Sequence, residues 1–120
     1  MRHRTDAFLK RQRRAPLYEA LVAHQKRHPH SFHVPGHKFG TSFDNEGLER
    51  YARVLELDVT EITGMDDLHQ PEGVIAEAQA LAAEAFHAEE TFFLVGGSTS
   101  GKIALNMALS QPRAKNLVQP

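Results

Sequence analysis

The stretch from Thr91 to Ala108, TFFLVGGSTSGKIALNMA, constrains the fold more than any other part of this 120-residue chain. Its aromatic and aliphatic run, Phe92–Val95, is short and is stopped by two glycines, which is typical of a buried strand. Three hydroxyl residues follow, and the apolar positions after Gly101 have helical spacing. The sequence therefore predicts a strand over Thr91–Val95, a turn, and a helix that begins by about Lys102.

A turn of this composition is suited to binding a phosphate group. The N-terminus of a helix presents unpaired backbone N–H groups and the positive end of the helix dipole. Hydroxyl side chains in the turn add further hydrogen-bond donors. We therefore predict a phosphate site at Gly97, Ser98, Thr99 and Ser100. The alternative is that Ser98 or Ser100 only caps the helix.

A nucleoside triphosphate site is another interpretation of the same turn. Gly96 to Lys102 matches the pattern G-x-x-x-x-G-K. In that pattern the next residue is Ser or Thr, which holds magnesium, whereas this chain has Ile103. No acidic strand motif accompanies the turn, so the nucleotide interpretation lacks both of its metal ligands.

Composition excludes several classes of function. The net charge of −1 gives the whole chain no bias toward nucleic acid. The absence of cysteine excludes disulfides and cysteine-ligated metals. No apolar run is long enough to span a membrane, and the first residues have no signal-peptide core. We expect a cytoplasmic protein whose partners include neither nucleic acid nor membrane.

Residues 1–14 are strongly basic, and we interpret them as a solvated, partly frayed tail, with a nucleic-acid or membrane contact as the alternative. Pro16 can begin a helix that ends before Pro29. Its narrow apolar face contains Leu17, Leu21 and Val22.

Two further helices are expected before the glycine turn. The first spans about residues 41–53, is led in by Ser42 or Asp44, and turns Leu48 and Tyr51 inward. The second opens at Pro71 or Glu72 and has the clearest amphipathic pattern of the chain. Seven of its residues recur at the spacing of one face: Val74, Ile75, Ala78, Leu81, Ala82, Ala85 and Phe86. Of these we predict that Val74, Ile75, Leu81, Ala82 and Phe86 are buried.

Histidines and paired acids suggest metal ligands at two places. The loop HSFHVPGHKFG contains His30, His33 and His37, but it has no acid, and its spacing fits neither a helical nor a strand face. We favour a rigid loop that brings His37 or Lys38 to a pocket. Adjacent carboxylates such as those of the pair at positions 66 and 67 do not converge easily on one ion, so we predict no metal site.

Three separated motifs together resemble one enzyme family. They are HVPGHK at 33–38, DVTEITGMDDLHQPEG at 58–73 and AEAQALAAEAFHAEETFFLVGGSTSG at 76–101. In order and spacing they resemble the bacterial ornithine/lysine/arginine decarboxylases, which are pyridoxal-phosphate enzymes of the aspartate-aminotransferase fold (fold type I). The resemblance covers nearly everything from Ala15 to Gln119.

The resemblance implies an α/β fold class of which this chain supplies an incomplete part. That part comprises the N-terminal helices and the first strand–turn–helix unit of the large domain. The implied organisation is a basic tail over 1–14, a helical and loop segment over 15–70, and the start of the pyridoxal-phosphate-binding large domain over 71–120.

Residue roles follow from the same resemblance. It implies that Gly97, Ser98, Thr99 and Ser100 hold the phosphate of pyridoxal 5′-phosphate. It places His37 and Lys38 near the mouth of the active site, and it matches Asp66, Asp67 and His69 to a signature stretch that can be structural. The chain departs from the family at Gly96 and Lys102, where Asn is usual, and at Phe39, where a small or polar residue is usual.

The implied activity is a lyase reaction of polyamine metabolism, the decarboxylation of lysine, ornithine or arginine, in a homo-oligomer of at least two subunits. The Schiff-base lysine, the acid on the pyridine nitrogen and the histidine stacked on the ring match positions beyond Pro120. We therefore assign no catalytic residue to this chain and expect an amino-terminal part that is inactive alone. The alternatives are a non-enzymatic remnant or subunit-interaction segment and a phosphate- or nucleotide-binding module.

Overall fold

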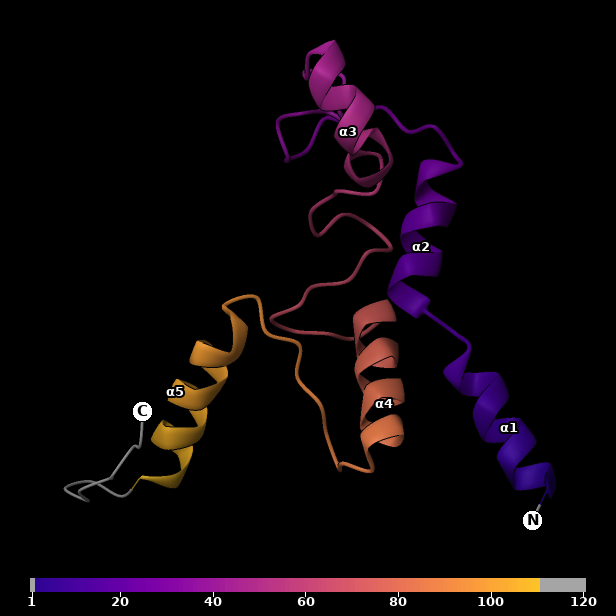
Figure 1. Ribbon diagram of the computed structural model, residues 1–120, viewed down its shortest axis with the longest axis vertical. Coiled ribbons are helices and arrows are strands. Elements are labelled where there is room, and N and C mark those ends of the chain that lie inside the picture. The colour runs from indigo at the N-terminus through magenta and orange to yellow at the C-terminus, as the bar shows by residue number, and fades with distance from the viewer. Residues whose placement is uncertain (1, 111–120) are drawn as a thin grey trace.

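Five helices joined by irregular segments make up residues 2–110, the part of the chain that the computed structural model describes (Figure 1). Their bounds are Arg2–Gln12 (α1), Pro16–Gln25 (α2), Asn45–Leu55 (α3), Val74–Phe86 (α4) and Gly97–Leu109 (α5). The described range contains no strand. None of its helices is long and apolar enough to cross a membrane.

Helix α2 begins and ends where local sequence signals predict. Pro16 occupies the first turn, where its missing N–H costs no hydrogen bond, and the helix ends at Gln25, before Pro29. The basic segment before it departs from our expectation, because it forms α1 instead of a frayed tail. The end of α1 contacts α4: the Gln12 side-chain amide donates to the Leu81 carbonyl at 3.0 Å, and Arg11 pairs with Glu84. These contacts, distant in sequence, stabilise a helix that has little apolar face.

Helix α3 is capped as predicted but packs differently. The Asp44 side chain accepts a hydrogen bond from the Gly47 N–H at 2.7 Å, which satisfies one free donor of the first turn. Leu48 is half-buried, whereas Tyr51 is exposed, so the prediction that Tyr51 turns inward is wrong. The reason is that α3 packs against no other described helix and meets mainly the loop around Gly40.

Helix α4 carries the small core of the described residues. It packs against α2, and the buried apolar side chains are those of Met65, Ile75 and Ala83 together with Pro16 of α2. The predicted burial of Ile75 is confirmed. Phe86, predicted on the same face, is 82% exposed, because it is the last residue of α4 and no other described element covers it.

The predicted strand over Thr91–Val95 is absent from the described residues. A strand exists through its ladder with a neighbouring strand, and no described segment offers one. The α/β class that the resemblance implies is therefore not visible as a sheet in the described residues. The predicted helix is present but begins at Gly97, so Ser98–Ser100 lie in its first turn and not in a preceding loop. Leu94 contacts α5 closely, since a Cβ added at Gly101 would lie 2.8 Å from a Leu94 methyl carbon.

The molecule is far more open than a compact protein of its size. Its radius of gyration is 19.1 Å, against about 14 Å expected for a compact domain of this length. Its accessible surface is 10331 Å², against roughly 6,500 Å² expected for 13.4 kDa. Figure 1 shows the cause, because α5 stands apart from the other four helices.

Candidate functional site

The start of α5, at Gly96 and Gly97, has the backbone geometry of a glycine-dependent turn. Gly97 has a φ of 68°, in the left-handed region that residues with a Cβ adopt at a cost. The space in which its Cβ would lie is open, with no atom within 4 Å. Gly96 is constrained differently, because a Cβ there would lie 2.8 Å from the Ser100 hydroxyl oxygen. That hydroxyl donates to the Gly97 carbonyl at 2.9 Å and so braces the turn.

The N-terminus of α5 is left without a cap in the described structure. No side chain accepts a hydrogen bond from its first N–H groups. Ser98 and Thr99 are exposed in the first turn. The first backbone N–H groups of a helix have no partner within it, so they and these two hydroxyls can donate to an anion. The residues that we predicted as a phosphate site are therefore brought together at one helix end.

The N-terminus of α4 is capped by the carboxylate of Asp66, which lies 7 to 10 residues before the N–H groups that it accepts from. One oxygen of Asp66 accepts from the backbone N–H groups of Gly73, Ile75 and Ala76 at 2.8, 2.9 and 3.3 Å. Its other oxygen accepts from Glu72 and Asp67 at 3.0 and 2.9 Å.

These donors have an electrostatic consequence. The N–H of Glu72, followed by those of Asp67, Gly73 and Ile75, holds the pKa of Asp66 well below its usual range, while desolvation opposes this shift. Asp66 itself has a φ of 70°. In the neighbouring turn the Asp67 carboxylate accepts from the His69 N–H at 2.7 Å. Asp66 thus organises the start of α4, and Asp67 organises the turn that precedes it.

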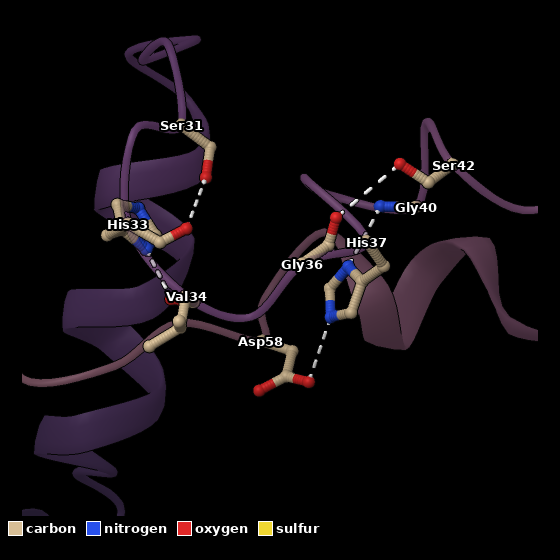
Figure 2. A network of polar contacts seen from close by, with 8 residues as sticks. All are labelled: Ser31, His33, Val34, Gly36, His37, Gly40, Ser42 and Asp58. Carbon is tan, nitrogen blue, oxygen red and sulfur yellow. Dashed lines mark hydrogen bonds and ion pairs between the residues drawn. The ribbon is translucent and has the colours of Figure 1, made fainter.

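His37 fixes the loop between α2 and α3 to the segment that follows α3 (Figure 2). The Gly40 N–H donates to His37 Nδ1 at 3.1 Å, and His37 Nε2 lies 3.1 Å from the Asp58 carboxylate. Because a backbone N–H can only donate, Nδ1 carries no proton, and Nε2–H donates to Asp58. The His37 ring is therefore held from both sides, by the Gly40 backbone and by the Asp58 carboxylate.

Lys38, the second residue predicted near the active-site mouth, turns back into its own loop. Its ammonium group donates to the His33 carbonyl. Both Lys38 and Phe39 have positive φ, at 50° and 56°. The loop lies beside α3 in Figure 1, well separated from α5. The structure therefore does not bring the two predicted groups of site residues together, and the mouth assignment stays a prediction.

Two observations bear on the remaining titratable groups. Within residues 2–110 no three histidine, aspartate or glutamate side chains are placed to hold a metal ion.

His24 is buried on α2, where its Nδ1 accepts from Arg27 at 3.0 Å and its Nε2 has no described partner. Burial, then the charges of Arg27 and His33, lowers the pKa of His24. Sequence reasoning missed this residue, although it continues the Leu17 and Leu21 face of α2 at helical spacing.

Comparisons with known proteins agree on one family. The sequence model described as Orn/Lys/Arg decarboxylase, major domain, matches residues 15–119. The chain is 47% identical over 104 residues to the uncharacterized protein YaaO of Bacillus subtilis (strain 168), a match that covers 87% of this chain and 22% of that protein. It is 45% identical over 104 residues to an arginine decarboxylase of Bacillus anthracis, a match that covers 86% of this chain and 21% of that protein.

A more distant match is the inducible ornithine decarboxylase of Escherichia coli (strain K12), 34% identical over 107 residues, covering 82% of this chain and 15% of the relative. The chain thus spans about a fifth or less of the length of these curated relatives. No solved structure matches it.

Proposed function

The chain belongs to the Orn/Lys/Arg decarboxylase family, and on this premise we propose that it is the part of a pyridoxal-phosphate-dependent amino-acid decarboxylase that holds the cofactor phosphate. One observation carries the proposal: α5 begins with an uncapped N-terminus at the hydroxyl residues that match the family's phosphate segment. The N-terminal N–H groups of α3 and α4 are satisfied by the carboxylates of Asp44 and Asp66, whereas α5, like α2, has no side-chain cap.

The residues present fit a phosphate group. Ser98 and Thr99 are exposed beside the free N–H groups, and Lys102 adds an exposed positive charge one turn along. Gly96 replaces the family's usual Asn without loss of the turn, since the Ser100 hydroxyl occupies the space that a side chain there would need.

In the bound state the cofactor would accept the electron pair that remains on the α-carbon when carbon dioxide leaves. The residues of this chain have a different task, which is to bind and orient the phosphate. The Schiff-base lysine and the acid for the ring nitrogen belong, by the family resemblance, to sequence outside these 120 residues. The chain alone is therefore expected to bind cofactor weakly and to release no carbon dioxide.

The proposed substrate is a basic amino acid, with arginine first. The relative named as an arginine decarboxylase is 45% identical, against 34% for the one named as an ornithine decarboxylase. The proposed setting is a cytoplasmic homo-oligomer that takes part in polyamine metabolism. A nucleotide site is not favoured, because Ile103 offers no hydroxyl for magnesium.

The binding energy of the isolated site can be estimated. Two to four charge-assisted hydrogen bonds are worth roughly 1.5–3 kcal/mol each in a formed site. Ordering the two flexible glycines and their neighbours opposes this by about 1–2 kcal/mol per residue. A net of about 4 kcal/mol corresponds to a dissociation constant on the order of 1 mM.

The test compares pyridoxal phosphate with pyridoxal, which lacks the phosphate but forms the same adventitious imines with lysines. The wild-type chain should bind the phosphate form more tightly, and Ser98→Ala plus Thr99→Ala should abolish that preference. Thr63→Ala, an exposed threonine outside the site, is the matched control and should retain it. Equal affinity of the wild-type chain for the two aldehydes would contradict the proposal.

A further inference from the structure

His24 is a buried histidine at the contact between α2 and the loop over residues 30–40. It is 8% exposed, and its ring centroid lies 6.4 Å from that of Phe39. The Phe39 ring in turn lies 6.0 Å from the ring of His33, edge to face. Because α2 supplies the first ring and the loop supplies the other two, this cluster joins the two segments. The proposed function makes no use of His24.

The hydrogen bonds of His24 fit a neutral ring. A guanidinium group can only donate, so His24 Nδ1 accepts from Arg27 at 3.0 Å and the ring proton lies on Nε2. That Nε2–H is buried and has no hydrogen-bond partner among the described residues. A second proton on Nδ1 would turn the acceptor that Arg27 uses into a donor. The charged ring would then present two buried N–H groups without an acceptor, which is costly.

The charges that face the ring also oppose its protonation. They come from Arg27 on the same helix and from His33 on the loop. Lys38 adds a further positive charge to the loop, since its ammonium group donates to the His33 carbonyl. Burial, followed by the charges of Arg27 and His33, lowers the pKa of His24. The closed contact therefore favours the neutral ring.

One carboxylate lies near this contact without neutralising it. Glu56, at the end of α3, lines a cavity of about 300 Å³ together with Phe39 and His28. Its carboxylate accepts from the Gln25 side-chain amide at 3.3 Å. Neither nitrogen of His24 bonds to it.

We propose that protonation of His24 opens the contact between α2 and the loop over residues 30–40, while the loop stays attached to α3 and the segment after it. The attachment that remains is at the other end of the loop. There His37 Nε2 lies 3.1 Å from the Asp58 carboxylate, a contact that a positive charge on His37 strengthens (Figure 2). Gly40 is buried beside α3, where a Cβ would lie 3.2 Å from carbons of Leu48 and Leu55. Acid thus weakens one attachment of the loop and preserves the other.

The direction and size of the effect follow from proton linkage. The pKa of His24 is lowered in the closed state and returns to its ordinary value of about 6.5 when the ring reaches water. The open state therefore binds more protons, and the ratio of open to closed molecules rises as the pH falls. If the ring stays neutral in the closed state, this ratio increases about tenfold between pH 7.5 and pH 5.5. The inference requires neither cofactor nor catalysis, so its test is independent of the proposed function.

Distances between two spin labels, measured by electron paramagnetic resonance, report the opening. The chain has no cysteine, so labels attach only where one is introduced. Tyr18→Cys on α2 and Phe32→Cys on the loop replace side chains that are 59% and 95% exposed. Tyr18→Cys with Phe86→Cys, at the end of α4, is the reference pair. His24→Gln and His24→Leu remove the titrating group, and His30→Gln, an exposed histidine of the same loop, is the matched control.

The ratio of long to short distances between α2 and the loop should rise about tenfold from pH 7.5 to pH 5.5 in the chain with His24 and in His30→Gln. It should change less than twofold in both His24 variants. The α2–α4 pair should keep one distance distribution, since the rest of the fold stays intact. Because a variant at His24 also alters packing, Arg27→Gln provides a second comparison: it keeps a donor for Nδ1, removes a facing charge and should reduce the rise.

Three results would overturn the proposal. The first is an equal distance distribution at the two pH values in the chain with His24. The second is an undiminished rise in the His24 variants or in Arg27→Gln. The third is a parallel change in the α2–α4 pair, which would show that acid unfolds the molecule as a whole instead of opening one contact.

Discussion

Replacement of Ile75 by alanine tests whether the small core on α4 holds the described fold together. Ile75 lies in the first turn of α4 and is 7% exposed. The change removes three carbons, each worth about 0.8 kcal/mol when buried, for a total of about 2.4 kcal/mol. Leu17, Leu21 and Leu68 line a hollow beside Ile75, so its neighbours are incompletely packed. The loss should therefore fall near the lower end of the roughly 2–5 kcal/mol range for such substitutions.

A loss of this size matters because little else is buried. A compact protein of this length would have roughly 6–18 kcal/mol of stability at 0.05–0.15 kcal/mol per residue. This chain buries few apolar side chains among its described residues, so its stability should lie at or below the lower limit. Ile75→Ala should then remove a large fraction of the stability of α2 and α4.

The assay is urea unfolding followed by circular dichroism at 222 nm. The matched control is Val54→Ala, which shortens an exposed aliphatic residue of α3 and should change the free energy of unfolding by less than about 0.5 kcal/mol. If the two variants unfold at the same urea concentration, α4 does not bury Ile75 in solution and the reasoning about the core is refuted.

Three further outcomes are expected. Because the pKa of Asp66 is lowered in the folded state, its ionised carboxylate stabilises the fold above the pKa that Asp66 has in the unfolded chain. Helical content should therefore fall as the pH drops below about 4. Asp66→Asn should lower helical content at pH 7 and flatten its dependence on pH, because the amide NH₂ would face backbone N–H donors. If helical content falls in acid as it does in the wild-type chain, Asp66 does not cap α4. The pKa of His24 is also lowered in the folded state, so the unfolded state binds more protons and the free energy of unfolding should fall as the pH drops below about 6.5. Urea titrations at pH 7 and pH 5 measure this loss of stability, and His24→Leu should reduce it. Identical losses in the wild-type chain and the variant would exclude His24 as the cause. Asp44→Ala should destabilise α3 by about 1 kcal/mol, measured by amide hydrogen exchange, and unaltered exchange would contradict the cap.

Local signals in the sequence predicted the helices well where their cause was local. Pro16 and Asp44 mark helix starts because the proline ring and the side-chain oxygen act within one turn. Periodicity identified Ile75 as buried but also included Phe86, because it shows which residues share a face and not how far a neighbour extends along it. The strand predicted over Thr91–Val95 is absent, because a strand forms only through a ladder with a neighbouring strand and the described residues contain no such neighbour.

In the candidate site, too, features with a local cause could be predicted from the sequence, and features that depend on contacts between distant residues could not. Glycine and hydroxyl chemistry predicted the cluster from Gly97 to Ser100, although α5 begins earlier than expected. The cap formed by Asp66 could not be predicted, because it joins a carboxylate to an N–H group nine residues away through a bent loop. Likewise, the contact of His37 with Asp58 spans 21 residues and depends on how the loop folds back.

The most direct test of the central claim is the dependence of decarboxylation on pyridoxal phosphate in a chimaera. This chain replaces the aligned segment of the Bacillus anthracis arginine decarboxylase, to which it is 45% identical. Carbon dioxide release from arginine is measured as the cofactor concentration is varied. We predict an active chimaera in which Ser98→Ala plus Thr99→Ala raises the cofactor concentration for half-maximal activity at least tenfold, whereas Thr63→Ala leaves it unchanged. A soluble chimaera without activity, or an active one whose cofactor requirement is the same with and without the two hydroxyls, would contradict the claim that the start of α5 holds the phosphate.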